Sequence, residues 1–179
     1  MLQKKIITLS LFLSGIFLIT SCTTIPPLDF TIPNVYISDN RQDAELKSLT
    51  VGFAPKEQQT VVQQTNATLP PIWKEALEDA INRSLIFTDD ASKKVNISAR
   101  IFEVNPPEIG LAMTTWVGAL YEVIDRSNGE VLVSEKIRTS GTVELSFAFE
   151  GMIRARESVN RAVRANIQEF ISVLEKSAL

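Results

Sequence analysis

Apolar and polar positions alternate with a period of two in several parts of the chain, and this alternation predicts β-strands with one buried face. The segment from Asp125 to Gly129 predicts a hairpin loop, because Asn128-Gly129 supplies residues that accept a positive φ. The predicted strands cover residues 49–53, residues 95–102, residues 111–124 and a return strand from residue 131.

Two other segments repeat apolar residues three and four positions apart, which predicts amphipathic helices. The first helix opens at Pro70-Pro71, where a missing N–H costs nothing, and its stripe contains Trp73, Leu77, Ala80, Ile81, Ser84 and Leu85. The second covers Met152 to Lys176, and its stripe contains Val159, Val163, Ile167, Phe170 and Leu174.

The predicted elements follow the order strand, helix, strand, strand, strand, helix. Strands joined by a hairpin pair antiparallel, and two amphipathic helices can cover one face of a sheet. The sequence therefore predicts the α+β class: a two-layer domain in which two helices cover a mostly antiparallel sheet of about four strands.

The N-terminus carries a different pattern. Lys4 and Lys5 precede an apolar run at residues 6–19, and small residues and Cys22 follow it. That order is typical of a secretory signal peptide. Two alternatives remain open: a transmembrane helix, since no charge occurs between Lys5 and Asp29, and an ordinary cleaved signal followed by a free cysteine.

The residues Ile19, Thr20, Ser21 and Cys22 resemble the lipobox of bacterial lipoproteins. The resemblance implies that the signal peptidase recognises Ile19, Thr20 and Ser21 and cuts before Cys22. It also implies a covalent diacylglycerol and an N-acyl chain on Cys22, with no other cofactor, and such a set of acyl chains gives stable anchoring. Thr23, where aspartate would retain a lipoprotein in the inner membrane, implies the outer membrane of a Gram-negative bacterium with the domain in the periplasm.

The chain divides into three expected parts. Prolines at positions 26, 27 and 33 favour extended chain, which predicts a tether after the cleavage site. The expected parts are a signal peptide at residues 1–21, a lipidated N-terminus and tether at residues 22–48, and a single globular domain at residues 49–179.

The composition of the chain excludes several classes of function. The 179 residues include no histidine and one cysteine, which excludes Ser-His-Asp and Cys-His catalysis, imidazole metal sites and an intramolecular disulfide. The formal net charge of -3 disfavours nucleic acid as a partner. The carboxylates lie on one helix face and at its end, where solvated side chains are expected, so no enzyme is predicted. A hydrolase or transferase that uses carboxylates alone is the alternative. These carboxylates are Glu75, Glu78, Asp79, Asp89 and Asp90.

A cluster of arginines opens the final helix and is the candidate site for anionic headgroups or an acidic partner. The alternative is a solvated face, because Glu157 stands four residues before one of these arginines. Four aromatic residues are candidates for a pocket or a partner groove, or for ordinary packing: Phe102, Trp116, Phe147 and Phe149. The arginines are Arg154, Arg156, Arg161 and Arg164.

In architecture the whole chain resembles small envelope lipoproteins of Gram-negative bacteria, and it is loosely similar to the YajG-like lipoproteins from Gly141 to Ser177. The resemblance implies no catalytic residues. The predicted function is a non-catalytic, lipid-anchored lipoprotein that binds another envelope component, either a protein or a glycolipid. The alternative is a lipid- or lipopolysaccharide-binding accessory factor in outer-membrane transport or assembly.

Overall fold

A computed structural model describes residues 25–62, 68–107 and 110–179 of the chain. The lipobox residues and the signal peptide lie outside the described residues. The elements are β1 (Ala44–Phe53), the 3-10 helix η1 (Lys56–Gln58), β2 (Val61–Val62), α2 (Leu69–Ser84), β3 (Lys93–Asn105), β4 (Met113–Asp125), β5 (Val131–Val143) and α3 (Gly151–Lys176). The predicted α+β class is confirmed, and β2 is a short strand that the sequence did not predict.

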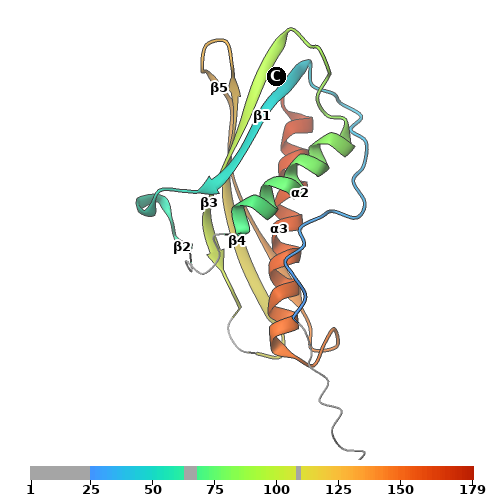
Figure 1. Cartoon of the computed structure of the whole chain (residues 1–179), viewed down its shortest axis with the longest axis vertical. Helices are drawn as coiled ribbons and strands as arrows, with labels where there is room; N and C mark the ends of the chain where they lie inside the picture. The colour runs from blue at the N-terminus through green and yellow to red at the C-terminus, as the bar shows by residue number, and fades with distance from the viewer. Residues whose placement is uncertain (1–24, 63–67, 108–109) are drawn as a thin grey trace, which may run out of the picture.

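The sheet has the order β1-β3-β4-β5, with β2 paired to the end of β3 beyond β1. The pairs β3–β4 and β4–β5 are antiparallel, whereas β1 runs parallel to β3. A parallel pair needs a crossover connection, and α2 lies in that connection. Figure 1 shows α2 and α3 on the same side of the sheet, so the fold has two layers.

The core lies between the helices and the inner face of the sheet, as the alternation predicted. The ring of Phe170 on α3 stacks on Tyr121 of β4 with 4.1 Å between the ring centroids. Burying each such side chain stabilises the fold by about 1.5–3 kcal/mol. The fully or nearly fully buried strand residues include Val95, Ile97, Ala99, Ile101, Val117, Ala119, Tyr121 and Val123.

A buried chain of hydrogen bonds joins both helices to the sheet. The indole of Trp73 donates to the Tyr121 hydroxyl at 3.2 Å, and that hydroxyl donates to Asn166 Oδ1 at 2.9 Å. Asn166 Nδ2 then donates to the carbonyl oxygen of Ile137 at 3.1 Å. Burial raises the pKa of Tyr121, so the phenol keeps its proton and remains a donor. Satisfied buried networks of this kind fix the register of the packed elements.

The segment before β1 packs into the domain. Phe30 is fully buried and meets Trp73 edge to face with 6.2 Å between the ring centroids, and Ile32 is also in the core. The tether predicted for residues 22–48 is therefore wrong for most of its described part. Its prolines do favour extended chain, but this extended chain lies along the helices and buries apolar side chains. The first strand also begins earlier than predicted, at Ala44 rather than at residue 49.

Polar contacts fix the same segment along α3. Near one end, the backbone N–H of Asp29 donates to Asn160 Oδ1 at 3.1 Å. Near the other end, the Glu175 carboxylate accepts the Ser38 hydroxyl at 2.8 Å and the backbone N–H of Asp39 at 3.1 Å. The hydrogen bond from Ser38 is the main cause that lowers the pKa of Glu175. These contacts thus fix the N-terminal segment against α3 near both ends of the segment.

In the hairpin after β4, only Gly129 has a positive φ, of 77°, so the expectation that Asn128 shares this conformation is wrong.

In the described part of the chain, no helix has the length and apolar character needed to cross a membrane.

Candidate functional site

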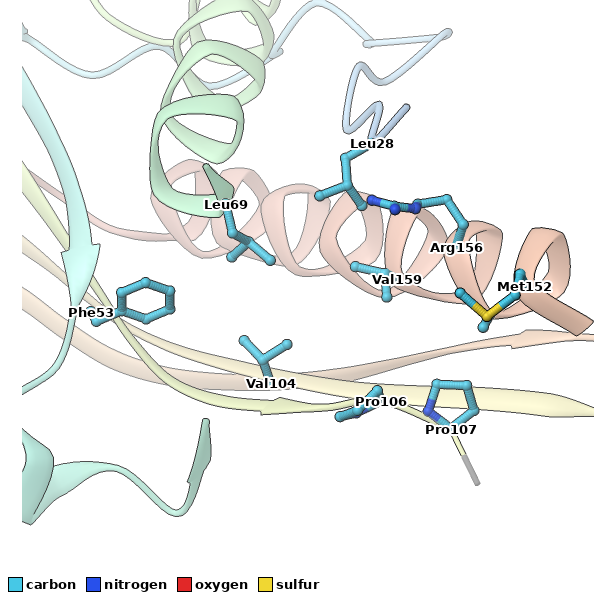
Figure 2. Close-up of a pocket in the computed structure, with 10 residues that line it drawn as sticks. Leu28, Phe53, Leu69, Val104, Pro106, Pro107, Met152, Arg156 and Val159 are labelled. Carbon is cyan, nitrogen blue, oxygen red and sulfur yellow. The ribbon is translucent and has the colours of Figure 1, made fainter. Parts of the chain in front are cut away.

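An apolar pocket lies between the first turns of α3 and the end of β3 (Figure 2). It encloses about 170 Å³. Its walls come from the N-terminal segment, the end of β1, the start of α2, the end of β3 and the first turns of α3. The lining residues are Leu28, Phe53, Leu69, Val104, Pro106, Pro107, Met152, Ala155, Arg156 and Val159.

The pocket exists because β3 continues past the end of β1. The last residue of β1, Phe53, pairs with Ile101, and a bulge at Phe102 follows. After this bulge, Val104 faces the helices. Figure 2 shows Leu69, the first residue of α2, on one side of the pocket and Met152 on the other. The first turns of α3 and the end of β3 therefore enclose an apolar space that α2 does not fill.

The volume limits what the pocket can hold. Ligand sites for drug-sized molecules measure about 300–1,000 Å³, whereas a dry cavity of about 150 Å³ binds benzene. The pocket in this protein is thus large enough for one apolar side chain of a partner or for the end of an acyl chain. A complete lipid exceeds this space.

Arg156 is the single charged side chain among the pocket's lining residues. In Figure 2 its side chain extends along the rim toward Leu28. Within the described part of the chain, Arg156 has no hydrogen bond and no ion pair. Its guanidinium group can therefore bind an anionic group that accompanies an apolar ligand.

Arg154 has a different role from the one predicted for it. The side chain is only 5% exposed, and its Nη1 donates to the carbonyl oxygens of Ala148 and Phe149 at 2.7 Å each. Its Nη2 donates to the carbonyl oxygen of Gly110 at 3.2 Å. The prediction that Arg154 binds an external anion is wrong. The position lies one turn before Ser158, which is also buried, so it belongs to the face that packs on the sheet.

The remaining two arginines of the cluster bind groups of the chain itself. Arg161 donates to Glu157 Oε1 at 3.0 Å and to the carbonyl oxygen of Thr142 at 2.9 Å. Arg164 donates to Asp29 Oδ2 at 3.2 Å, which ties α3 to the N-terminal segment. The structure therefore does not bring the four arginines together as one anion-binding surface.

The aromatic candidates separate into two groups. On the open face of the sheet, the guanidinium carbon of Arg138 lies 4.0 Å from the ring centroid of Trp116, and Phe102 packs over Gly118. Arg138 also makes a bidentate ion pair with the buried carboxylate of Glu103, at 2.7 and 2.9 Å. These contacts are ordinary packing. Phe147 and Phe149 are exposed beyond the end of β5.

The pocket was not predicted from the sequence, because its walls come from five separate segments of the chain. The proline pair at Pro106-Pro107 was the available signal, since it ends β3 beyond the last residue of β1. In the described part of the chain, no group of three or more histidine, cysteine, aspartate or glutamate residues could hold a metal ion.

Comparison with known proteins establishes the fold. No family model and no curated protein matches this sequence. Protein XCC0632 from Xanthomonas campestris, of the family DUF330, is 12% identical over 82% of this chain and 90% of that chain, with a TM-score of 0.51. Protein CT253 from Chlamydia trachomatis is 12% identical over 75% of this chain and 97% of that chain, also with a TM-score of 0.51.

A weaker match is a minor lipoprotein from Acinetobacter baumannii. It is 11% identical over 73% of this chain and 90% of that chain, with a TM-score of 0.42. At these identities, the two matches with a TM-score of 0.51 define the fold class and nothing finer.

Proposed function

We propose that this protein is a non-catalytic lipoprotein of the Gram-negative outer membrane, anchored through acyl chains on Cys22. Its pocket binds an apolar side chain of another envelope protein. The observation that carries this proposal is the open apolar pocket beside the N-terminal segment. Its volume of about 170 Å³ fits one side chain, and apolar anchors seated in such pockets dominate the energy of protein interfaces.

The path of the chain supports the choice of an envelope partner. Leu28 lines the pocket and stands six positions after Cys22. Six extended residues span at most about 21 Å, so a lipid on Cys22 keeps the pocket close to the bilayer surface. A partner that reaches the pocket is then itself at or in the membrane.

Arg156 favours a second candidate function. An apolar pocket with a guanidinium group at its rim that pairs with no described residue fits the end of an acyl chain whose lipid carries a phosphate. The second candidate is therefore a lipid- or lipopolysaccharide-binding accessory factor. It differs from the first in needing the charge of Arg156, because an apolar side chain of a protein partner does not use that charge.

The anchor is tested with Cys22→Ala in the full chain. Loss of the thiol removes the site of acylation, so this variant is expected to leave the membrane fraction, whereas Ser21→Ala is expected to remain there. Fractionation of cells followed by immunodetection measures the difference. Retention of Cys22→Ala in the membrane to the same extent as the unaltered protein contradicts the anchor.

The pocket is tested with Ala155→Phe, which places a ring in the cavity. A photocrosslinking residue at Met152 is expected to capture its partner in intact cells, and Ala155→Phe is expected to reduce the adduct about tenfold, the effect of losing an anchor worth about 1.4 kcal/mol. Ala165→Phe, half-buried on the same helix but absent from the pocket lining, is the matched control and should leave the adduct unchanged.

The mass of the adduct separates the two candidate functions. A protein-sized adduct that persists in Arg156→Gln supports the protein partner. An adduct with the mass of a lipid that is lost in Arg156→Gln supports the lipid-binding alternative. Equal adducts in Ala155→Phe and Ala165→Phe show that the pocket is not the binding site.

A further inference from the structure

A second apolar surface lies at the end of the domain where α3 begins. Three segments contribute to it: the chain before β4, the connection from β5 to α3, and the first turn of α3. The side chain of Phe149 is the most exposed of the set, at 88%. A single exposed apolar side chain is ordinary on a protein surface. Here, however, five large apolar side chains come from segments that are held together, and such a patch marks a binding surface. This surface, which we name the apolar end, comprises Leu111, Leu145, Phe147, Phe149 and Met152.

The backbone of the apolar end is fixed. Arg154 uses its buried guanidinium group to bind the carbonyl oxygens of Gly110, Ala148 and Phe149, which join all the contributing segments. Hydrogen bonds from a charged donor are among the stronger ones in proteins. The exposed apolar side chains therefore stand on a connection that is held in one place, rather than on a loose loop that could fold back.

The chain enters the domain at this same end. Ile25 is the first described residue, and shortly after it Leu28 shares the pocket with Met152. Figure 1 shows the start of the N-terminal segment beside the first half of α3, far from the hairpin between β4 and β5. Cys22 stands only three positions before Ile25, so the two lie at most about 10 Å apart.

We propose that the apolar end inserts into the interface of the bilayer that carries the lipid anchor. This inference rests on the proposed acylation of Cys22. A lipid within about 10 Å of Ile25 keeps the bilayer at a high effective concentration beside the apolar end. Aromatic and aliphatic side chains that stand out from a polar surface bind at the boundary between headgroups and acyl chains.

Charged neighbours limit the depth of insertion. Glu144 and Glu150 are exposed at the two ends of the connection that carries Phe147 and Phe149, and carboxylates stay in contact with water. The guanidinium carbon of Arg161 lies 5.3 Å from the ring centroid of Phe147, and because Arg161 is ion-paired with Glu157, this charged pair also stays in contact with water. Insertion therefore reaches the headgroup boundary and no further, and it points the β4–β5 hairpin away from the membrane.

The test uses the full-length lipoprotein, purified from membranes and reconstituted in vesicles of phosphatidylethanolamine and phosphatidylglycerol. Phe149→Trp places a reporter at the apolar end. Val131→Trp, at an exposed apolar position of the opposite hairpin, is the matched control. With lipids brominated near the headgroup, the emission of Phe149→Trp is expected to fall about twofold more than that of Val131→Trp, since only an inserted side chain meets the bromines.

The outcomes separate the inference from the proposed function. Equal quenching of Phe149→Trp and Val131→Trp in protein that floats with the vesicles overturns the insertion and leaves the anchor standing. Protein that does not float and lacks acyl chains overturns the anchor and the insertion together. A crosslink between reactive residues placed at position 149 of two copies, together with no quenching, shows that a second copy of this chain covers the apolar end. This outcome also overturns the insertion.

Discussion

Gly141→Val is expected to lower the free energy of unfolding by about 3 kcal/mol, the upper part of the range for overpacked sites. A Cβ atom at Gly141 would lie 2.4 Å from the carbonyl oxygen of Ser158 and 2.5 Å from the backbone nitrogen of Ala162. Both atoms belong to the backbone of α3, which cannot rotate away as a side chain can. The whole helix has to move off β5, and the contacts of its buried stripe weaken with it.

Gly52→Val is the matched control for this prediction. Gly52 also lies in a strand, but an added Cβ there meets no atom within 4 Å. Valine suits an extended backbone better than glycine, so this variant should be as stable as the unaltered domain or slightly more stable. Urea unfolding followed by circular dichroism measures both variants. A Gly141→Val domain with the unaltered midpoint contradicts the close approach of α3 to β5.

Arg154→Ala is expected to lower the free energy of unfolding by about 2–4 kcal/mol, because three carbonyl oxygens lose a charged donor together. Arg156→Ala is the matched control. It stands two residues further along α3 without a hydrogen bond or ion pair in the described part of the chain, so its effect should stay within about 0.5 kcal/mol.

Limited proteolysis adds a local readout to this comparison. The connection from Glu144 to Glu150 is expected to be cut faster in Arg154→Ala than in Arg156→Ala, since Arg154 fixes its carbonyl groups. Equal unfolding midpoints and equal cleavage of the two variants contradict the structural role of Arg154. An unfolding midpoint lowered by Arg156→Ala alone contradicts the assignment of the two roles.

The layers of this fold could be predicted from its sequence because the buried faces repeat regularly. Val95, Ile97, Ala99 and Ile101 alternate along β3, and they lie inside as expected. The N-terminal segment has no such repeat. Phe30 and Ile32 are two buried residues among prolines and polar residues, and local pattern alone does not distinguish them from a tether.

The site was harder to predict for a related reason. Arg154 occupies a helix face that small residues also occupy at Ser158 and Ala162, and this spacing signals close packing on the sheet. The carbonyl oxygens that accept its hydrogen bonds come from two separate segments, however, and the one at Gly110 is 44 residues away, so no local rule brings them together. The pocket has the same origin, since Leu28, Phe53 and Met152 meet only in the folded chain.

These features form one arrangement. The N-terminal segment packs along α3, so under the proposed acylation of Cys22 the domain stands close to the membrane rather than at the end of a long tether. The apolar end and the pocket share Met152 and lie where the chain enters the domain. Under the proposed acylation of Cys22, the lipid orients the pocket toward the membrane surface, where the proposed envelope partner reaches it.

The covalent state of Cys22 is the central claim of this account. Intact-mass spectrometry of the protein extracted from outer membranes tests it most directly. The predicted mass is that of a chain beginning at Cys22, with a diacylglycerol on its sulfur and an acyl chain on its nitrogen. A chain that begins at Met1, or one that begins at Cys22 or later without acyl groups, contradicts the account.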